Sequence, residues 1–470
     1  MSAHRDFKAG WRVLRRTAGA AGLVGCFALA GTGASLADSL TAAMVSAYEN
    51  NPTLNAARAA LRATDENLAQ AKGGYRPRVV ASGDYGVATS SVDPVGGDRF
   101  HTGSNPAGVS ITVTQDLFRG FRTRNAIKGA KSAIFAGREG LINEEQNTLL
   151  SAVEAYMNVV RDSAVVNLNV QNLSVLREQL RSVQDRFDVG EVTRTDVAQS
   201  EAGVQQAISQ LLEAESNLAA SQASYRQVVG RNPNRLSYPK SFPLPLPKNL
   251  KTALASALSE HPAIKSSEHG VEAAEYNVKT ITGELLPTIS LEASATRRWE
   301  SSSSVQVADS ASLVGRLTIP IYQQGVVSSR VRQAKQTRSQ RRLEADATRD
   351  QVRAAVVSAW AGLDAARGQE IADQAQINAA ELALSGVREE ERVGQRTILD
   401  VLDAQQNVLS ARVNLTSTQR NKVVAAYSLL SAMGRLTARS LGLSVREYSP
   451  EVHTEAIKDR WIGLRTPDGN

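Results

Sequence analysis

The chain has 470 residues, enough for two or three ordinary domains, and carries 54 Lys and Arg against 47 Asp and Glu. Cys26 is the only cysteine, which excludes an internal disulfide and a thiolate metal site. Aromatic residues make up only 5% of the chain, which favours long helices in contact with water over a large globular core.

The first 37 residues have the order of a secretory signal peptide. Basic residues come first, among them Lys8, Arg12, Arg15 and Arg16. A small and apolar stretch follows and ends in Ser35-x-Ala37, which predicts cleavage after Ala37. Removing residues 1–37 leaves 49 basic against 46 acidic residues, a net charge of +3, so the chain is not expected to bind nucleic acid. A membrane anchor, or a lipid left on Cys26 of "LVGC", remains as an alternative.

Most of the remaining chain consists of two similar halves. "NNPTL" at 50–54 recurs as "EHPAI" at 260–264, and "VGEVTRTDV" from 189 recurs as "VGQRTILDV" from 393. This duplication predicts two structural repeats. The expected parts are repeat 1 (38–230), a Pro-rich connector (231–249), repeat 2 (250–436) and a C-terminal tail (437–470).

In chain order, each repeat is predicted to begin with one helix of about 30 residues and to continue with two strands. The predicted strands cover about 79–89 and 107–117 in repeat 1, and about 287–298 and 311–321 in repeat 2. Polar stretches between them, 89–108 and 299–311, are expected to be loops. Apolar and polar residues alternate, as Val109, Ile111 and Val113 do with their neighbours. This alternation fits a small soluble sheet as well as a membrane barrel.

Helical hairpins are predicted over 122–229 and 328–433, because no proline interrupts either segment. Residues 122–188 could form one helix of about 100 Å. Apolar residues recur every seven positions in the returning segments, namely Val197, Val204, Leu211, Leu218 and Tyr225, then Val401, Val408, Leu415 and Leu429. This period predicts left-handed coiled-coil packing.

Each hairpin is predicted to turn at a glycine, Gly190 or Gly394, and then to restart as a helix. In the second copy Asp400 and Asp403 are three residues apart, so they share one helix face. A solvated role as helix-start acids is the alternative reading. The histidines show no ligand spacing and no nucleophile or phosphate-loop motif occurs, so we expect no enzyme activity, no cofactor and no structural metal.

The signal peptide, the duplicated unit, the two turn phrases and the strand-exit phrase "LTIPIYQQG" together resemble the TolC-like outer-membrane efflux protein family over about 38–440. The resemblance implies an α+β membrane protein in the outer membrane of a Gram-negative bacterium. Three chains would each give four strands to a twelve-stranded transmembrane β-barrel. Their coiled-coil hairpins would continue it as an α-barrel into the periplasm.

The implied function is a passive exit duct of a tripartite efflux pump or a type I secretion system. The implied partners are two further copies of the chain, outer-membrane lipid, a periplasmic adaptor (membrane fusion protein) and an inner-membrane transporter of the RND or ABC class. An alternative is a coiled-coil periplasmic spacer or adhesin with a small β-head and no pore.

The resemblance also assigns roles to residues of the two hairpin turns. Asp400 and Asp403 would line the narrow periplasmic end as a selectivity ring open to cation block. A gate latch would join Thr195 and Asp196 to Arg396, with Glu391 standing where similar proteins have a tyrosine. The adaptor-docking turns would comprise Val189, Gly190, Val393, Gly394 and Thr397.

Overall fold

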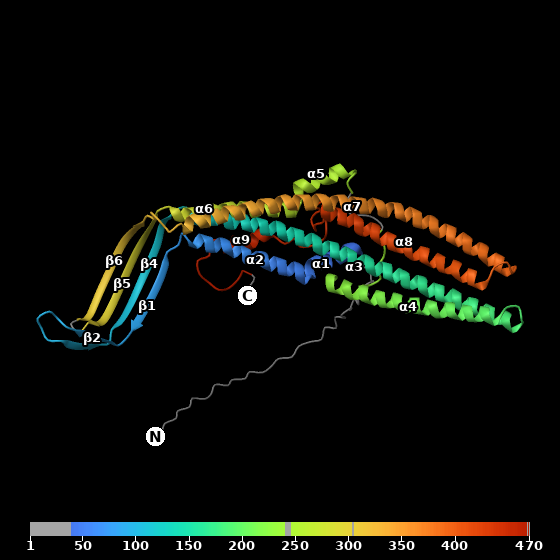
Figure 1. Cartoon of the computed structure of the whole chain (residues 1–470), viewed down its shortest axis with the longest axis horizontal. Coiled ribbons are helices and arrows are strands. Elements are labelled where there is room, and N and C mark those ends of the chain that lie inside the picture. The colour runs from blue at the N-terminus through green and yellow to red at the C-terminus, as the bar shows by residue number, and fades with distance from the viewer. Residues whose placement is uncertain (1–38, 240–245, 303–304, 468, 470) are drawn as a thin grey trace, which may run out of the picture. The chain divides into compact units, whose positions relative to one another are not determined.

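The computed structural model describes residues 39–239, 246–302, 305–467 and 469 (Figure 1). The predicted signal peptide, with Cys26, lies outside these residues, as does part of the Pro-rich connector. Among the described residues, no helix is both long and apolar enough to cross a membrane.

Each repeat begins with two short helices where one was predicted. They are α1 (Leu40–Asn50) and α2 (Pro52–Gly73) in repeat 1, and α5 (Leu250–Glu260) and α6 (Pro262–Thr282) in repeat 2. The single-helix prediction was wrong because a proline at the first helical position starts a new helix in both copies. Asn51 caps the new helix by accepting from the backbone N–H of Thr53 at 2.9 Å, and His261 does the same for Ala263 at 3.1 Å.

Four antiparallel strands form one sheet in the order β1-β4-β5-β6. Their bounds are β1 (Arg78–Tyr85), β4 (Ala107–Arg119), β5 (Thr288–Ser302) and β6 (Val305–Thr318), and a 3-10 turn, η1 (Gly283–Leu285), precedes β5. The β4–β5 pairing joins the two repeats. Figure 1 shows the four strands side by side at the end of the helices where α2 and α6 finish.

The two stretches expected to be loops contain strands, so that expectation was wrong. Within 89–108 a separate ribbon pairs β2 (Ala88–Val92) with β3 (Phe100–Ser104), and within 299–311 both β5 and β6 continue. Backbone hydrogen bonds hold a strand pair together whatever the side chains are, and threonine and valine favour it further. The polar composition of these two stretches was therefore not sufficient to predict loops.

The strand register sorts the sheet into an apolar and a polar face. Residues directly opposite each other on neighbouring strands share a face. The apolar face carries the rows Val79–Val113–Ala293–Leu313 and Ala81–Ile111–Ala295–Ala311. The polar face carries the rows Ser82–Ser110–Thr296–Ser310 and Val80–Thr112–Ser294–Ser312. On the apolar face Leu313 is 69% exposed and Ile111 is 54% exposed, which is the arrangement that an apolar surrounding would stabilise.

The helical hairpins are α3 (Arg122–Asp188) with α4 (Arg194–Val229) and α7 (Val326–Arg392) with α8 (Ile398–Ala432). The predicted seven-residue seams lie at the helix contacts. Their buried members include Val204, Ala207, Ala214, Ser221 and Tyr225 in α4, and Val401, Val408, Ala411, Thr418 and Leu429 in α8. Helix α8 packs against both α7 and α3, so it joins the two hairpins.

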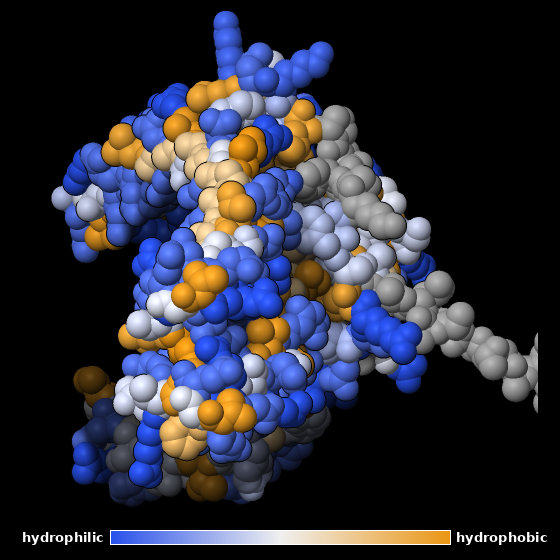
Figure 2. Space-filling view, turned by 90° about the vertical axis from the view of Figure 1, so that its right-hand side faces the viewer, coloured by the Kyte–Doolittle hydropathy of each residue, from blue (hydrophilic) through white to orange (hydrophobic). Residues whose placement is uncertain are grey.

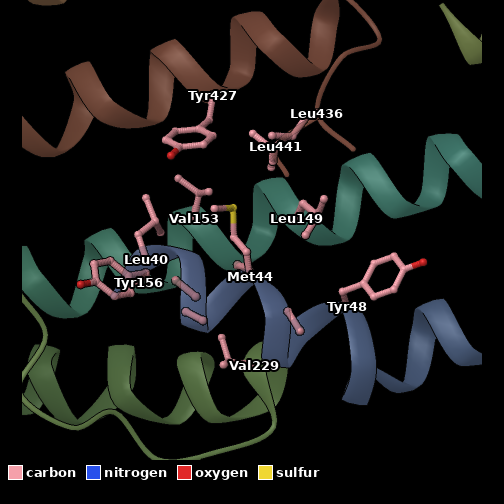
Figure 3. Close-up of a cluster of buried hydrophobic side chains, with 14 of the residues drawn as sticks. Leu40, Met44, Tyr48, Leu149, Val153, Tyr156, Val229, Tyr427, Leu436 and Leu441 are labelled. Carbon is pink, nitrogen blue, oxygen red and sulfur yellow. The ribbon is translucent and has the colours of Figure 1, made fainter. Parts of the chain in front are cut away.

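The main apolar core lies where α1, the middle of α3, the ends of α4 and α8, and the segment after α8 meet (Figure 3). Met44 and Leu149 are fully buried there, and Leu436 and Leu441 come from beyond α8. Tyr156 also donates a hydrogen bond from its hydroxyl to the carbonyl of Ser237 at 2.8 Å, which ties the connector to α3. Burying each of the large side chains stabilises the fold by about 2 kcal/mol.

The segment after 437, expected only as a tail, returns along the first repeat. It contains α9 (Pro450–Ile457), which packs on α2. His453 Nδ1 lies 3.1 Å from Asp65 Oδ2, and their side chains are only 9% and 1% exposed. Asp459 pairs with Lys72 at 2.6 Å, so the tail is held to α2 at two points.

We predict that His453→Ala loosens the tail, because it leaves the buried carboxylate of Asp65 without its histidine partner. Leaving a buried polar group without its hydrogen-bond partner costs about 2 kcal/mol. Limited trypsin digestion should then cut faster after Arg446 and Arg460, which are exposed on either side of α9. His269→Ala is the control, because His269 faces the partly exposed Glu272 at 3.5 Å. Equal digestion of both variants would show that the pair does not hold the tail.

Candidate functional site: the two hairpin turns

The repeated phrase builds the same turn at the end of each hairpin. Gly190 has a φ of +83° and Gly394 a φ of +76°, a left-handed conformation that glycine adopts without strain. The N–H of Gly190 donates to the carbonyl of Phe187 at 2.9 Å, and that of Gly394 donates to the carbonyl of Glu391 at 2.9 Å. These bonds close the last turns of α3 and α7.

A capping box restarts the chain as a helix after each turn. The Asp196 Oδ2 atom accepts from the N–H of Thr193 at 2.8 Å, and the Asp400 Oδ2 atom accepts from the N–H of Thr397 at 2.9 Å. In return, each threonine hydroxyl accepts from the aspartate N–H at 3.3 Å. The predicted helix starts are confirmed, and both first aspartates act as caps.

The charged form of Asp400 is stabilised in the single chain. The pKa of Asp400 is lowered below its ordinary value of 3.8. The largest cause is the hydrogen bond from the backbone N–H of Thr397, and the Thr397 hydroxyl and the nearby positive charge of Arg396 add to it. Because this pKa is depressed by folding, the cap contributes fully above 3.8 and is lost as pH falls through the lower folded value. Asp400 therefore stays ionised at neutral pH.

Asp403 lies one turn further along α8 and faces a groove of about 220 Å³ between α3, α4 and α8. Glutamine side chains line much of this groove, namely Gln199, Gln206, Gln405 and Gln406. Among the described residues Asp403 has no hydrogen-bond or ion-pair partner. Asp400 and Asp403 thus differ in surroundings, one held by a cap and the other open to solvent.

An ion pair that the sequence analysis missed joins the two hairpins. Arg186 Nη1, near the end of α3, lies 2.9 Å from Glu391 Oε1, near the end of α7. The Glu391 side chain is mostly buried, and its hydrogen bond raises the pKa of Arg186. Opposite charges close to the two glycines, four residues before Gly190 and three before Gly394, were the available signal. Glu391 is therefore a partner within the chain.

Of the other residues predicted to form the gate latch, Asp196 and Arg396 contact their own hairpins in one chain. Arg396 Nε lies 2.9 Å from Glu390 Oε2, and its Nη1 lies 3.9 Å from Asp400 Oδ1. Asp196 belongs to its own capping box, and Thr195 is exposed. An Asp196–Arg396 contact stays a prediction, and in this arrangement it would have to form between chains.

The turns place two isolated apolar side chains on a hydrophilic end. Val189 is 73% exposed and Val393 is 71% exposed. Figure 2 looks onto this end and shows a mostly hydrophilic surface broken by separate hydrophobic residues. Over the part of the chain that the structure describes, no group of three or more His, Cys, Asp or Glu side chains could hold a metal ion.

Comparison with known proteins places this geometry in a family. Residues 43–231 and 253–435 match the family model described as "Outer membrane efflux protein". The chain is 45% identical over 438 residues to the outer membrane efflux protein BepC of Brucella suis, covering 93% of this chain and 94% of the relative. It is 24% identical to the outer membrane protein TolC of Escherichia coli, covering 93% and 90%.

Solved structures show the same fold. The Campylobacter jejuni CmeC outer membrane channel superposes with a TM-score of 0.75 at 17% identity, covering 89% of each chain. The open-state Neisseria gonorrhoeae MtrE outer membrane channel superposes with a TM-score of 0.67 at 19% identity, covering 84% of this chain and 88% of the other.

We predict that Arg186→Ala lets the two hairpin ends separate, because it removes the charged link between α3 and α7. Spin labels on Val189→Cys and Val393→Cys should report a broader distance distribution than in the parent. Arg181→Ala is the matched control, since Arg181 pairs with Glu178 on the same helix. An unchanged distribution in Arg186→Ala would mean that helix packing alone positions the turns.

Proposed function

The chain belongs to the outer membrane efflux protein family, and on that premise we propose that three copies form one passive exit duct. The protein is an outer-membrane channel-tunnel for efflux or type I secretion, with the α+β fold of that family. The proposal concerns how its strands and hairpins make the duct.

The observation that carries the proposal is the unfinished sheet. Strands β1 and β6 lie at its two edges, so each leaves one row of backbone N–H and C=O groups without a partner strand in the described chain. A membrane allows no such open edge, and four strands are too few to close a barrel. Three copies supply twelve strands, with β6 of one chain pairing with β1 of the next.

The two faces of the sheet fit this closure. The apolar face would point outward to lipid, and the serine- and threonine-rich face would line the water-filled interior. In a periplasmic spacer or adhesin with a small β-head, the apolar sheet face would be exposed to water, which is unfavourable. That exposure favours the duct over this second candidate.

The hairpin turns would form the periplasmic end of the duct. Asp400 and Asp403 from three chains would make two rings of carboxylates there, with Thr195, Asp196 and Arg396 forming contacts between neighbouring hairpins. The exposed valines at Val189 and Val393 would offer a periplasmic adaptor apolar contacts on a polar surface. An inner-membrane RND or ABC transporter would supply the energy.

We predict that the purified protein conducts ions in a planar bilayer as a trimer and favours cations over anions. Ionised carboxylates at a constriction attract cations, and trivalent metal ions added on the hairpin side should block the current. Asp400→Ala with Asp403→Ala should remove most of the selectivity and the block. Asp346→Ala with Asp350→Ala, which removes the same charge far from the turns, should keep both.

If crosslinking in native membranes yields only the monomer, or if the purified protein does not conduct ions, the proposal of a trimeric duct is contradicted. Wild-type selectivity and block in the Asp400 and Asp403 double variant would contradict only the placement of the rings.

We also predict that Arg396→Ala with Asp196→Asn raises the conductance, because it weakens the proposed contact between chains. Asparagine keeps an oxygen that can accept from Thr193, so the capping box of α4 survives. Arg392→Ala is the control, since Arg392 pairs with Glu389 on the same helix. Conductance equal to that of the parent would assign Arg396 and Asp196 to a solvated role.

A further inference from the structure

One charged pair interrupts the apolar face of the sheet. Arg297 on β5 and Asp309 on β6 are directly opposite each other, in the row next to Ala295 and Ala311. Arg297 Nε lies 2.6 Å from Asp309 Oδ1, and Arg297 Nη2 lies 2.6 Å from Asp309 Oδ2. This two-pronged geometry is the strongest form of an arginine–carboxylate contact, and it leaves Nη1 without a hydrogen bond among the described residues.

The position of the pair along the strands places it at a lipid boundary. Strand β5 starts at Thr288 and β6 ends at Thr318, so the pair lies nine residues from the helix end of the sheet on both strands. Nine residues span about 30 Å along a strand, or about 23 Å of height at the usual barrel tilt. The apolar band of such barrels is about 25 Å tall. The pair therefore lies where hydrocarbon meets headgroups, in the leaflet away from the helices.

A groove runs from this pair along the apolar face. It is open, with a volume of about 920 Å³. Small residues lie along it, namely Ala81, Gly83, Ala295 and Ala311, and Val109 and Ile111 project beside them. The hydroxyl residues Ser82, Ser110, Thr296 and Ser310 complete its lining. The groove therefore combines apolar and hydroxyl residues with one charged pair on β5 and β6, a mixed polarity that suits an amphiphilic lipid.

We propose that this groove holds one phosphorylated glycolipid of the outer leaflet. An acyl chain lies over the alanine and glycine positions, and a phosphate oxygen accepts from Arg297 Nη1. A sugar hydroxyl donates to a carboxylate oxygen of Asp309. A bare phosphate would be repelled by Asp309, whereas a phosphorylated sugar offers an anion to the guanidinium and an O–H donor to the carboxylate. The pair would then be hydrogen-bonded on its open side at the water boundary.

The test is lipid retention by the purified trimer in detergent, measured by native mass spectrometry with added bisphosphorylated diglucosamine lipid. Arg297→Gln with Asp309→Asn should weaken retention about tenfold, the effect of losing a charge-assisted hydrogen bond. The matched control is Arg298→Gln with Asp84→Asn. That pair, 3.5 Å apart, lies one residue away on the polar face, and its loss should leave retention unchanged.

A second variant keeps the test decisive if the first fails to assemble. Ala295→Leu fills the groove without altering a charge and should also weaken retention. The same glycolipid without phosphates should bind more weakly than the phosphorylated form. Equal retention by all variants, equal loss in the control pair, or preference for phosphatidylethanolamine would overturn the proposal. None of these results depends on whether the trimer conducts.

Discussion

A sheet that lies in lipid must satisfy every backbone N–H and C=O within protein, and the rest of this molecule follows from that constraint. The chain offers four strands with an apolar and a polar face, and leaves the edges of β1 and β6 open. Within one chain, β4 of repeat 1 pairs with β5 of repeat 2, so the backbone groups along these two strand edges are hydrogen-bonded to each other. The proposed trimer would repeat the same solution between chains.

The two repeats share the same turn geometry, and they differ in the charged side chains near the turns. Both turns use a glycine with positive φ and a threonine–aspartate capping box. The charges before the glycines differ, however, with Arg186 in one copy and Glu391 in the other. Because Arg186 and Glu391 carry opposite charges, they attract each other across the two hairpins. The second aspartate, Asp403, also exists in one copy alone, so only the second turn can contribute two carboxylates to a ring.

Features with a regular period could be predicted from the sequence, and features made by distant single contacts could not. Alternation predicted the faces of β4 and β5, and the seven-residue spacing predicted the buried seam through Val204 and Val408. The Arg186–Glu391 pair joins residues 205 positions apart, and no local pattern encodes such a contact. The tail was missed for the same reason, since its links to α2, the buried His453–Asp65 contact and the Lys72–Asp459 pair, join residues 388 and 387 positions apart. The proline breaks at Pro52 and Pro262 were visible in the sequence but were read as helix continuations.

The two ends of the hairpins are stabilised by different physical means. Along the middle of α3, buried side chains such as Leu149 and Met157 each contribute about 2 kcal/mol, and many of them act together. Close to the turns, the hairpins are linked by the packing of Leu402 on the α3–α4 seam and by the Arg186–Glu391 pair, in which Arg186 is about one-third exposed. Exposed ion pairs contribute about 1 kcal/mol or less. Salt weakens such a pair further, whereas it leaves apolar burial intact. A duct of the kind proposed needs this gradient, because its wall must stay closed to the periplasm while its end opens at little cost. The largest apolar core therefore lies away from the turns, and in the proposed duct the turns would be the part that a partner protein moves.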